Sequence, residues 1–103
     1  MSVINVTKEN FEAEVLKSDV PVLADFNAGW CGPCRAMKPM LDELAEGNTA
    51  YKIVSIDIDD QDELADEYDV SSIPCLVVFK GGEEVNRSVG LIARDAIAEL
   101  VEG

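Results

Sequence analysis

The strongest constraint on the fold of this chain is a strand that is apolar on both faces and leads directly into an amphipathic helix. The segment "VPVLADFN" (residues 20–27) is apolar at nearly every position, which is typical of a central strand covered on both sides. From Cys31 onward, apolar residues recur at helical spacing until Gly47 and Asn48, which predict the end of a helix. A strand of this kind needs covering layers, so the sequence predicts an α/β protein.

The segments around this unit predict further strands and helices. Residues 2–6 ("SVINV") alternate like a short edge strand, and residues 51–58 ("YKIVSIDI") predict another buried strand. Thr7 is the expected N-cap of a helix that buries Phe11 and Val15. Asp59 and Asp60 are expected to open a short helix, because acidic residues suit the positive end of the helix dipole.

The last third of the chain predicts a hairpin and a closing helix. The strands "CLVVFK" (residues 75–80) and "EEVNRSVG" (residues 83–90) flank a Gly-Gly turn, and residues 91–103 are amphipathic. Strands connected through helices run parallel, whereas the strands of a hairpin are antiparallel. The order β-α-β-α-β-α-β-β-α therefore predicts a mixed sheet with helices on both faces.

Length and charge limit what the chain can do. A length of 103 residues fits one domain, residues 1–103, and no apolar window approaches the roughly 18 residues of a membrane span. With 21 acidic and eight basic residues the net charge is −13, which argues against nucleic acid or an anionic membrane as a partner. An acidic surface of this kind keeps a protein soluble, docks a basic partner or reflects adaptation to salt. The amino end lacks the pattern of a secretory leader, so we expect a cytoplasmic protein.

Cys31 and Cys34 are the candidate reactive groups. Cysteines at positions i and i+3 of a first helical turn lie on one face, close enough to form a disulfide. Backbone N–H groups and the dipole at the helix start favour the thiolate of Cys31, which we expect to attack, while Cys34 is less exposed and resolves. Pro33 suits the first turn because it needs no N–H partner there. A structural staple, a zinc site and an iron-sulfur cluster that recruits Cys75 are the weaker alternatives.

The motif "WCGPC" (residues 30–34) resembles the active site of the thioredoxin family, and the resemblance covers the whole chain. Four further landmarks of that family follow in the same order as in its members. They are an Asp-Phe pair at the end of the preceding strand, a proline within the helix, an Ile-Pro before the next strand and a Val-Gly after the hairpin. In this sequence those landmarks are Asp25-Phe26, Pro39, Ile73-Pro74 and Val89-Gly90.

The resemblance implies a thioredoxin fold, with a central five-stranded mixed β-sheet flanked by four α-helices, and a general protein-disulfide reductase activity. It implies a cis Ile73-Pro74 bond and an apolar surface that grips extended substrate backbone. The residues of that surface are Trp30, Gly32, Pro33, Ile73, Pro74, Val89 and Gly90.

The resemblance also bears on cofactors and partners. It implies an electron carrier with no cofactor and no metal, only the redox-active Cys31-Cys34 disulfide. We expect a monomer that reduces disulfide-containing target proteins. Because the chain carries no nucleotide-binding motif, we expect a separate thioredoxin reductase to recharge it. A specialised thiol-redox protein or an iron-sulfur-binding protein of the same fold is the alternative.

Asp25 is the third candidate for a catalytic role. An acid in an apolar strand is most often a strand-end residue that reaches water, but six residues before Cys31 it can lie beneath the active-site turn. Desolvation raises the pKa of a carboxyl group there and makes it a proton acceptor, and the family match favours proton transfer with Cys34.

The sequence departs from the family pattern at four positions. Asn27 stands where many members have an aromatic residue, and Gly29 where proline or glutamate is common, which predicts a looser and more polar entry to the active-site turn. The lysine that many members place near the buried aspartate falls on Ser55, so Asp25 lacks one influence that holds it ionised. Cys75 replaces the usual threonine and is expected to be a buried core residue, with oxidative regulation as the alternative.

Overall fold

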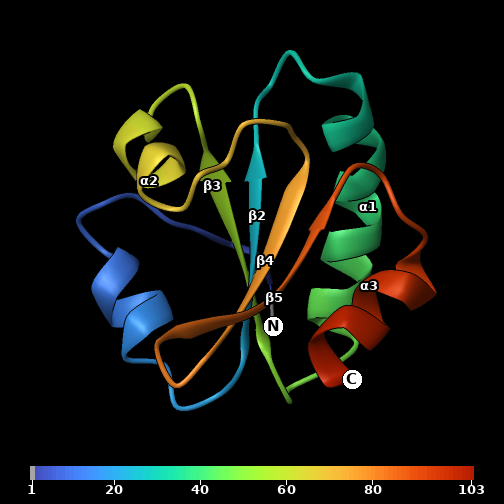
Figure 1. Ribbon diagram of the computed structural model, residues 1–103. Coiled ribbons are helices and arrows are strands. Elements are labelled where there is room, and N and C mark those ends of the chain that lie inside the picture. The colour runs from blue at the N-terminus through green and yellow to red at the C-terminus, as the bar shows by residue number, and fades with distance from the viewer. Residues whose placement is uncertain (1) are drawn as a thin grey trace.

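The computed structural model describes residues 2–103, which form a five-stranded sheet between two layers of helices (Figure 1). The strands are β1 (Ile4–Asn5), β2 (Val22–Asn27), β3 (Lys52–Asp57), β4 (Cys75–Lys80) and β5 (Glu83–Val89). Their order in the sheet is β1-β3-β2-β4-β5. The β1, β3 and β2 strands run parallel, and β4 and β5 are antiparallel to their neighbours. The predicted mixed sheet is confirmed.

Helices cover both faces of the sheet, as predicted. They are a short helix η1 (Glu12–Leu16), α1 (Gly32–Glu46), α2 (Asp62–Glu67) and α3 (Arg94–Glu102). Figure 1 shows α1 and α3 on one face and α2 on the other, where the blue helical segment near the N-terminus also lies. The hydrogen bond from Lys17 N to Glu12 O spans five residues, so η1 is a single wide turn.

Two of the helices begin later than the sequence predicts. Thr7 caps only the turn before η1, where its hydroxyl accepts a hydrogen bond from Glu9 N at 3.3 Å, and Phe11 precedes the helix itself. In the same way α2 begins at Asp62, and the Asp59–Asp60 pair forms a turn in which Asp57 Oδ1 accepts from Asp59 N. In both places a short polar side chain satisfies the backbone before the helix starts, which competes with helical hydrogen bonding.

The alternation of side chains along the central strands divides the core into two layers. Val22, Ala24 and Phe26 of β2 pack with the residues of η1 and α2, whereas Leu23 packs with Met37 of α1. Successive residues of a strand point to opposite faces, so Asp25 lies on the α1 face with Leu23. Desolvation of such a large apolar area is the main stabilising term of a domain this size.

The same alternation separates Cys75 from the cysteine pair. Cys75 and Val77 of β4 pack in the layer beneath η1 and α2, while Leu76 packs beneath α1 and α3. Cys31 and Cys34 cluster with Ala28 in a separate group at the end of the sheet. Cys75 therefore lies on the opposite face of the sheet from α1 and its N-terminal cysteines.

Candidate active site

Helix α1 begins at the cysteine pair, as the sequence predicts. Cys31 is the N-cap residue and Pro33 lies in the first turn, where its missing N–H leaves no helical hydrogen bond unmade. The Sγ atom of Cys31 accepts a hydrogen bond from Cys34 N at 3.3 Å. A sulfur at this position receives a backbone donor and the positive end of the helix dipole, and both favour its thiolate form.

Cys31 and Cys34 form a disulfide whose Cα atoms are 5.2 Å apart. The expected difference in exposure between the two is not present in this oxidised form, because the residues are 6% and 5% exposed. Ile58 and Ile73 pack against the pair and cover part of it. Burial therefore does not distinguish the two cysteines, whereas their positions at the start of α1 do.

Asp25 is the only buried acidic residue in the described part of the chain and lies on the α1 side of the sheet. Burial raises its pKa from 3.8 to about 7, and the hydrogen bond from the Asn27 side chain opposes this rise only in part. Its Oδ1 atom has no hydrogen-bond partner within residues 2–103. A carboxyl group with a free oxygen and a pKa near neutrality is suited to take up and release a proton.

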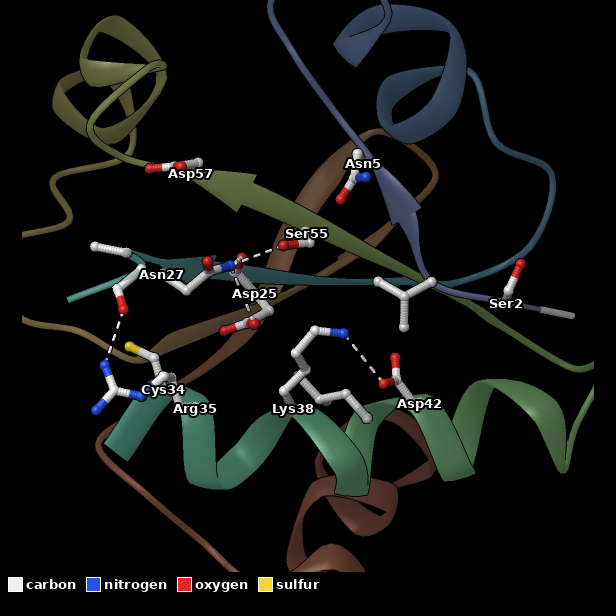
Figure 2. A pocket seen from close by; sticks show the side chains of 14 residues that line it. Ser2, Asn5, Asp25, Asn27, Cys34, Arg35, Lys38, Asp42, Ser55 and Asp57 are labelled. Carbon is white, nitrogen blue, oxygen red and sulfur yellow. Dashed lines mark hydrogen bonds and ion pairs between the residues drawn. The ribbon is translucent and has the colours of Figure 1, made fainter. Parts of the chain in front are cut away.

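A cavity of about 370 Å³ opens beside Asp25, between the sheet and α1. Its lining includes Asp25, Asn27, Cys34, Ser55 and Asp57. Figure 2 shows the Asp25 carboxyl directed into this space from β2, with Cys34 entering it from the start of α1. The structure therefore brings Asp25 and Cys34 to the walls of one cavity.

Asn27 and Ser55 complete the surroundings of Asp25. Asp25 and Ser55 are register partners on β2 and β3, so their side chains share the α1 face. The Asn27 amide lies 2.8 Å from Ser55 Oγ and 3.2 Å from Asp25 Oδ2. This end of the strand is polar, as predicted, but these contacts hold Asn27 in place rather than leaving it loose. Gly29 is open, and a Cβ added there would meet no atom within 4 Å.

The residues of the predicted binding surface come from three segments: the start of α1, the residues before β4, and the end of β5. Trp30 and Val89 are the most exposed large apolar side chains of these segments, at 66% and 57%. Gly32 and Pro33 are also exposed, whereas Ile73 is half-buried and Pro74 is buried. The Ile73-Pro74 bond is cis, as the resemblance implied.

A backbone hydrogen bond joins two of these segments. Gly90 N donates to Pro74 O at 2.8 Å, which fixes the Val89-Gly90 segment beside the Ile73-Pro74 segment. Gly90 has a φ of 100°, a conformation that residues with a side chain rarely adopt, and this accounts for glycine at the position. Ile73 in turn contacts the cysteine group. The structure thus places Val89, Gly90, Ile73 and Pro74 together at the disulfide.

Two contacts at the site were not predicted from the sequence. Trp30 Nε1 donates a hydrogen bond to Asp59 Oδ2 at 2.9 Å, and Arg35 donates to Gly29 O at 2.9 Å. From the sequence, Asp59 is expected only to open a helix. The Asn27 contact with Asp25 did have a signal, because residues two apart in a strand share a face. The Asp59 contact bridges 29 positions and has no local signal.

Cys75 is a free thiol in the core, 1% exposed, as predicted. Burial raises the pKa of this thiol, which suppresses its thiolate form. Its place on the opposite face of the sheet means that it cannot serve as a third ligand with Cys31 and Cys34. Within residues 2–103 no group of three or more Cys, Asp or Glu side chains is arranged to hold a metal ion. Each helix of this span is too short or too polar to traverse a lipid bilayer.

An N-capping cysteine, a second cysteine one turn later and a buried acid on the sheet below define a thiol-disulfide exchange protein. The family model described as thioredoxin matches residues 2–103. A thioredoxin of Bacillus subtilis is 47% identical over 102 residues, covering 98% of this chain and 96% of the relative. A thioredoxin of Pyropia yezoensis is 44% identical over 102 residues, covering 98% and 95%. A solved mutant thioredoxin of Halobacterium salinarum superposes with a TM-score of 0.90 at 38% identity, covering 98% of this chain and 88% of that one.

The chain therefore belongs to the thioredoxin family. Its function is reversible dithiol-disulfide redox exchange, and the alternatives of a specialised or iron-sulfur-binding protein are not favoured. Thioredoxins act on disulfide-containing targets through their own disulfide, without a cofactor, and are recycled by a reductase.

Proposed function

We propose that this chain is a protein-disulfide reductase in which Cys31 attacks and Cys34 resolves. The observation that carries the proposal is the position of Cys31 as N-cap of α1, with its sulfur accepting the Cys34 N–H. In the reduced protein the Cys31 thiolate attacks one sulfur of a target disulfide, and the other target sulfur leaves as a thiolate. Cys34 then loses its proton and attacks Cys31 Sγ. The target departs reduced by two electrons, and the Cys31-Cys34 pair is oxidised.

Asp25 accepts the proton that Cys34 must lose. The support for this role is its burial on the α1 face, its pKa of about 7 and its free Oδ1 atom on the cavity that Cys34 also lines. Near neutral pH a carboxyl group with this pKa is partly ionised, so it can take the proton and return it to water. Asp25→Asn should slow reduction of a protein disulfide near pH 7, and rates that match wild type at every pH would reject the role.

The three segments around the disulfide form the surface that receives the target. This surface lies around the disulfide and presents both apolar side chains and free backbone. Its residues are Trp30, Gly32, Pro33, Ile73, Pro74, Val89 and Gly90. An extended segment of a target protein can add to such backbone while its side chains contact Trp30 and Val89. The surface selects for exposed disulfides in flexible segments rather than for one protein sequence.

Residues 1–103 act as one thioredoxin domain and as a monomer in the cytoplasm, where reduced targets are the favoured products. No cofactor or metal takes part, and the two electrons lost at each turnover are restored by a separate thioredoxin reductase. The net charge of −13 repels nucleic acid and anionic membranes, so neither is a partner.

The reduction of insulin disulfides by dithiothreitol, followed as turbidity, tests the proposal. Wild type and Cys75→Ser should both accelerate the reaction, because Cys75 is a core residue on the other face of the sheet. Cys31→Ser should not accelerate it, since no thiolate remains to attack. Acceleration by Cys31→Ser, or no acceleration by wild type, would contradict the proposed reductase activity.

A further inference from the structure

The side-chain amide of Asn27 is hydrogen-bonded to the buried carboxyl group of Asp25. Its nitrogen lies 2.9 Å from Asp25 O, 3.2 Å from Asp25 Oδ2 and 2.8 Å from Ser55 Oγ. The backbone carbonyl oxygen of Asp25 can only accept a hydrogen bond, Oδ2 can only accept one when Asp25 is ionised, and Ser55 Oγ can accept as well. An amide oxygen placed there would face two acceptors, so the nitrogen is the atom that points to Asp25. Figure 2 shows this amide between the Asp25 carboxyl and Ser55.

The other ionisable side chains around Asp25 are engaged elsewhere or lie on other faces. On α1, the cation of Lys38 pairs with Asp42 at 3.2 Å, Arg35 donates to Gly29 O, and Cys34 is held in the disulfide. Asp57 of β3 accepts from Asp59 N at the cavity wall, and Cys75 of β4 lies across the sheet. Among the described residues, Asn27 is therefore the one side chain that donates a hydrogen bond to the Asp25 carboxyl.

We propose that Asn27 is a positioning residue for the exchange reaction, one that ties the Asp25 carboxylate to Ser55 and so sets the pH range in which Asp25 takes up a proton. The inference rests on the proposed proton-accepting role of Asp25. An amide N–H stabilises the ionised carboxylate more weakly than a neighbouring cation does, so Asp25 stays titratable near neutral pH. It also fixes Oδ2 and leaves Oδ1, which has no partner in residues 2–103, as the proton-accepting atom.

Two measurements test the inference independently. The first is a pH titration of the Asp25 carboxyl carbon by nuclear magnetic resonance in the oxidised protein, in which Cys31 and Cys34 do not titrate. The second is the pH profile of insulin reduction. Asn27→Leu keeps the approximate size of the side chain and removes the donor, so the Asp25 midpoint should rise by about half to one pH unit. The midpoint of the acidic limb of the rate profile should move to higher pH by a similar amount.

Further variants separate the hydrogen bond from a general disturbance of the strand. Asn27→Asp places a second carboxylate beside Asp25 and should raise the midpoint further than Asn27→Leu does. Ser55→Ala removes the far anchor of the amide and should produce a smaller rise. Asn5→Leu is the matched control, because Asn5 lines the same cavity and its side chain makes no hydrogen bond to Asp25. Lys38→Met tests a cation of α1 that lines the same cavity.

Matching rises in the titration and the rate profile of Asn27→Leu, with Asn5→Leu and Lys38→Met close to wild type, support the inference. An Asp25 midpoint that is the same in Asn27→Leu, Asn27→Asp and wild type overturns it, and so does a shift seen in Lys38→Met instead. A titration that shifts while the rate profile stays fixed overturns the proton-accepting role of Asp25, and with it the claim that Asn27 sets the pH range of the reaction.

Discussion

Replacing Asp25 by asparagine should stabilise the oxidised protein, and the gain should grow with pH. The pKa of Asp25 is raised by burial from 3.8 to about 7 in the folded protein. Between these two values the folded state keeps a proton that the unfolded chain has lost, so wild-type stability falls as pH rises through this window and is constant above it. The difference of about three units between the two pKa values corresponds to a loss of about 4 kcal/mol of unfolding free energy. Asparagine does not titrate and avoids this loss.

Urea unfolding of the oxidised wild type and Asp25→Asn at several pH values from 4 to 9 measures the effect. The difference in unfolding free energy should increase by about 4 kcal/mol between pH 4 and pH 8.5, with most of the increase below pH 7. Asp60→Asn removes an exposed carboxylate and controls for the change in net charge. A difference between Asp25→Asn and wild type that is the same at every pH would refute the reasoning that burial raises the pKa of Asp25.

Three further predictions follow from the site. Ser55→Lys places a cation at the register partner of Asp25 and should lower the Asp25 midpoint by at least about one pH unit in a carboxyl titration; an unchanged or higher midpoint would contradict the placement. A thiol reagent should label Cys31 of the reduced native protein quickly, because the helix start favours its thiolate, and Cys75 only after denaturation, because burial raises the pKa of its thiol; quick labelling of Cys75 would contradict its burial. Val89→Asp should reduce kcat/KM for insulin about tenfold with little change in Tm, since Val89 is an exposed part of the apolar surface; wild-type kcat/KM would show that targets do not contact this loop.

The cysteine pair and the strand beneath it were predictable because their signals are local. Cys31 as N-cap and Pro33 in the first turn follow from the requirements of a helix start. The position of Asp25 on the α1 face follows from alternation along a strand that is otherwise buried. Each of these features depends on residues within a few positions of one another.

The contacts that tune the site were not predictable because they depend on register and on distant loops. Asn27 bridges Asp25 to Ser55 only because β2 and β3 align these residues, and a shift of one position would turn Ser55 to the other face. Trp30 meets Asp59 because the loops after two parallel strands lie side by side, which the sequence of neither loop shows. The late starts of η1 and α2 reflect side chains of Thr7 and Asp57 that cap turns, and composition alone does not distinguish such a cap from a helix N-terminus.

The most direct test of the central claim is to trap the mixed disulfide. Reduced Cys34→Ser, mixed with a disulfide-bonded target protein, should accumulate a covalent complex joined through Cys31, because the resolving thiol is gone. Mass spectrometry of the digested complex should identify Cys31 as the linked residue, and Cys31→Ser should trap no complex. A complex linked through Cys75, or equal trapping by Cys31→Ser and Cys34→Ser, would contradict the assignment of Cys31 as the attacking group and Cys34 as the resolving one.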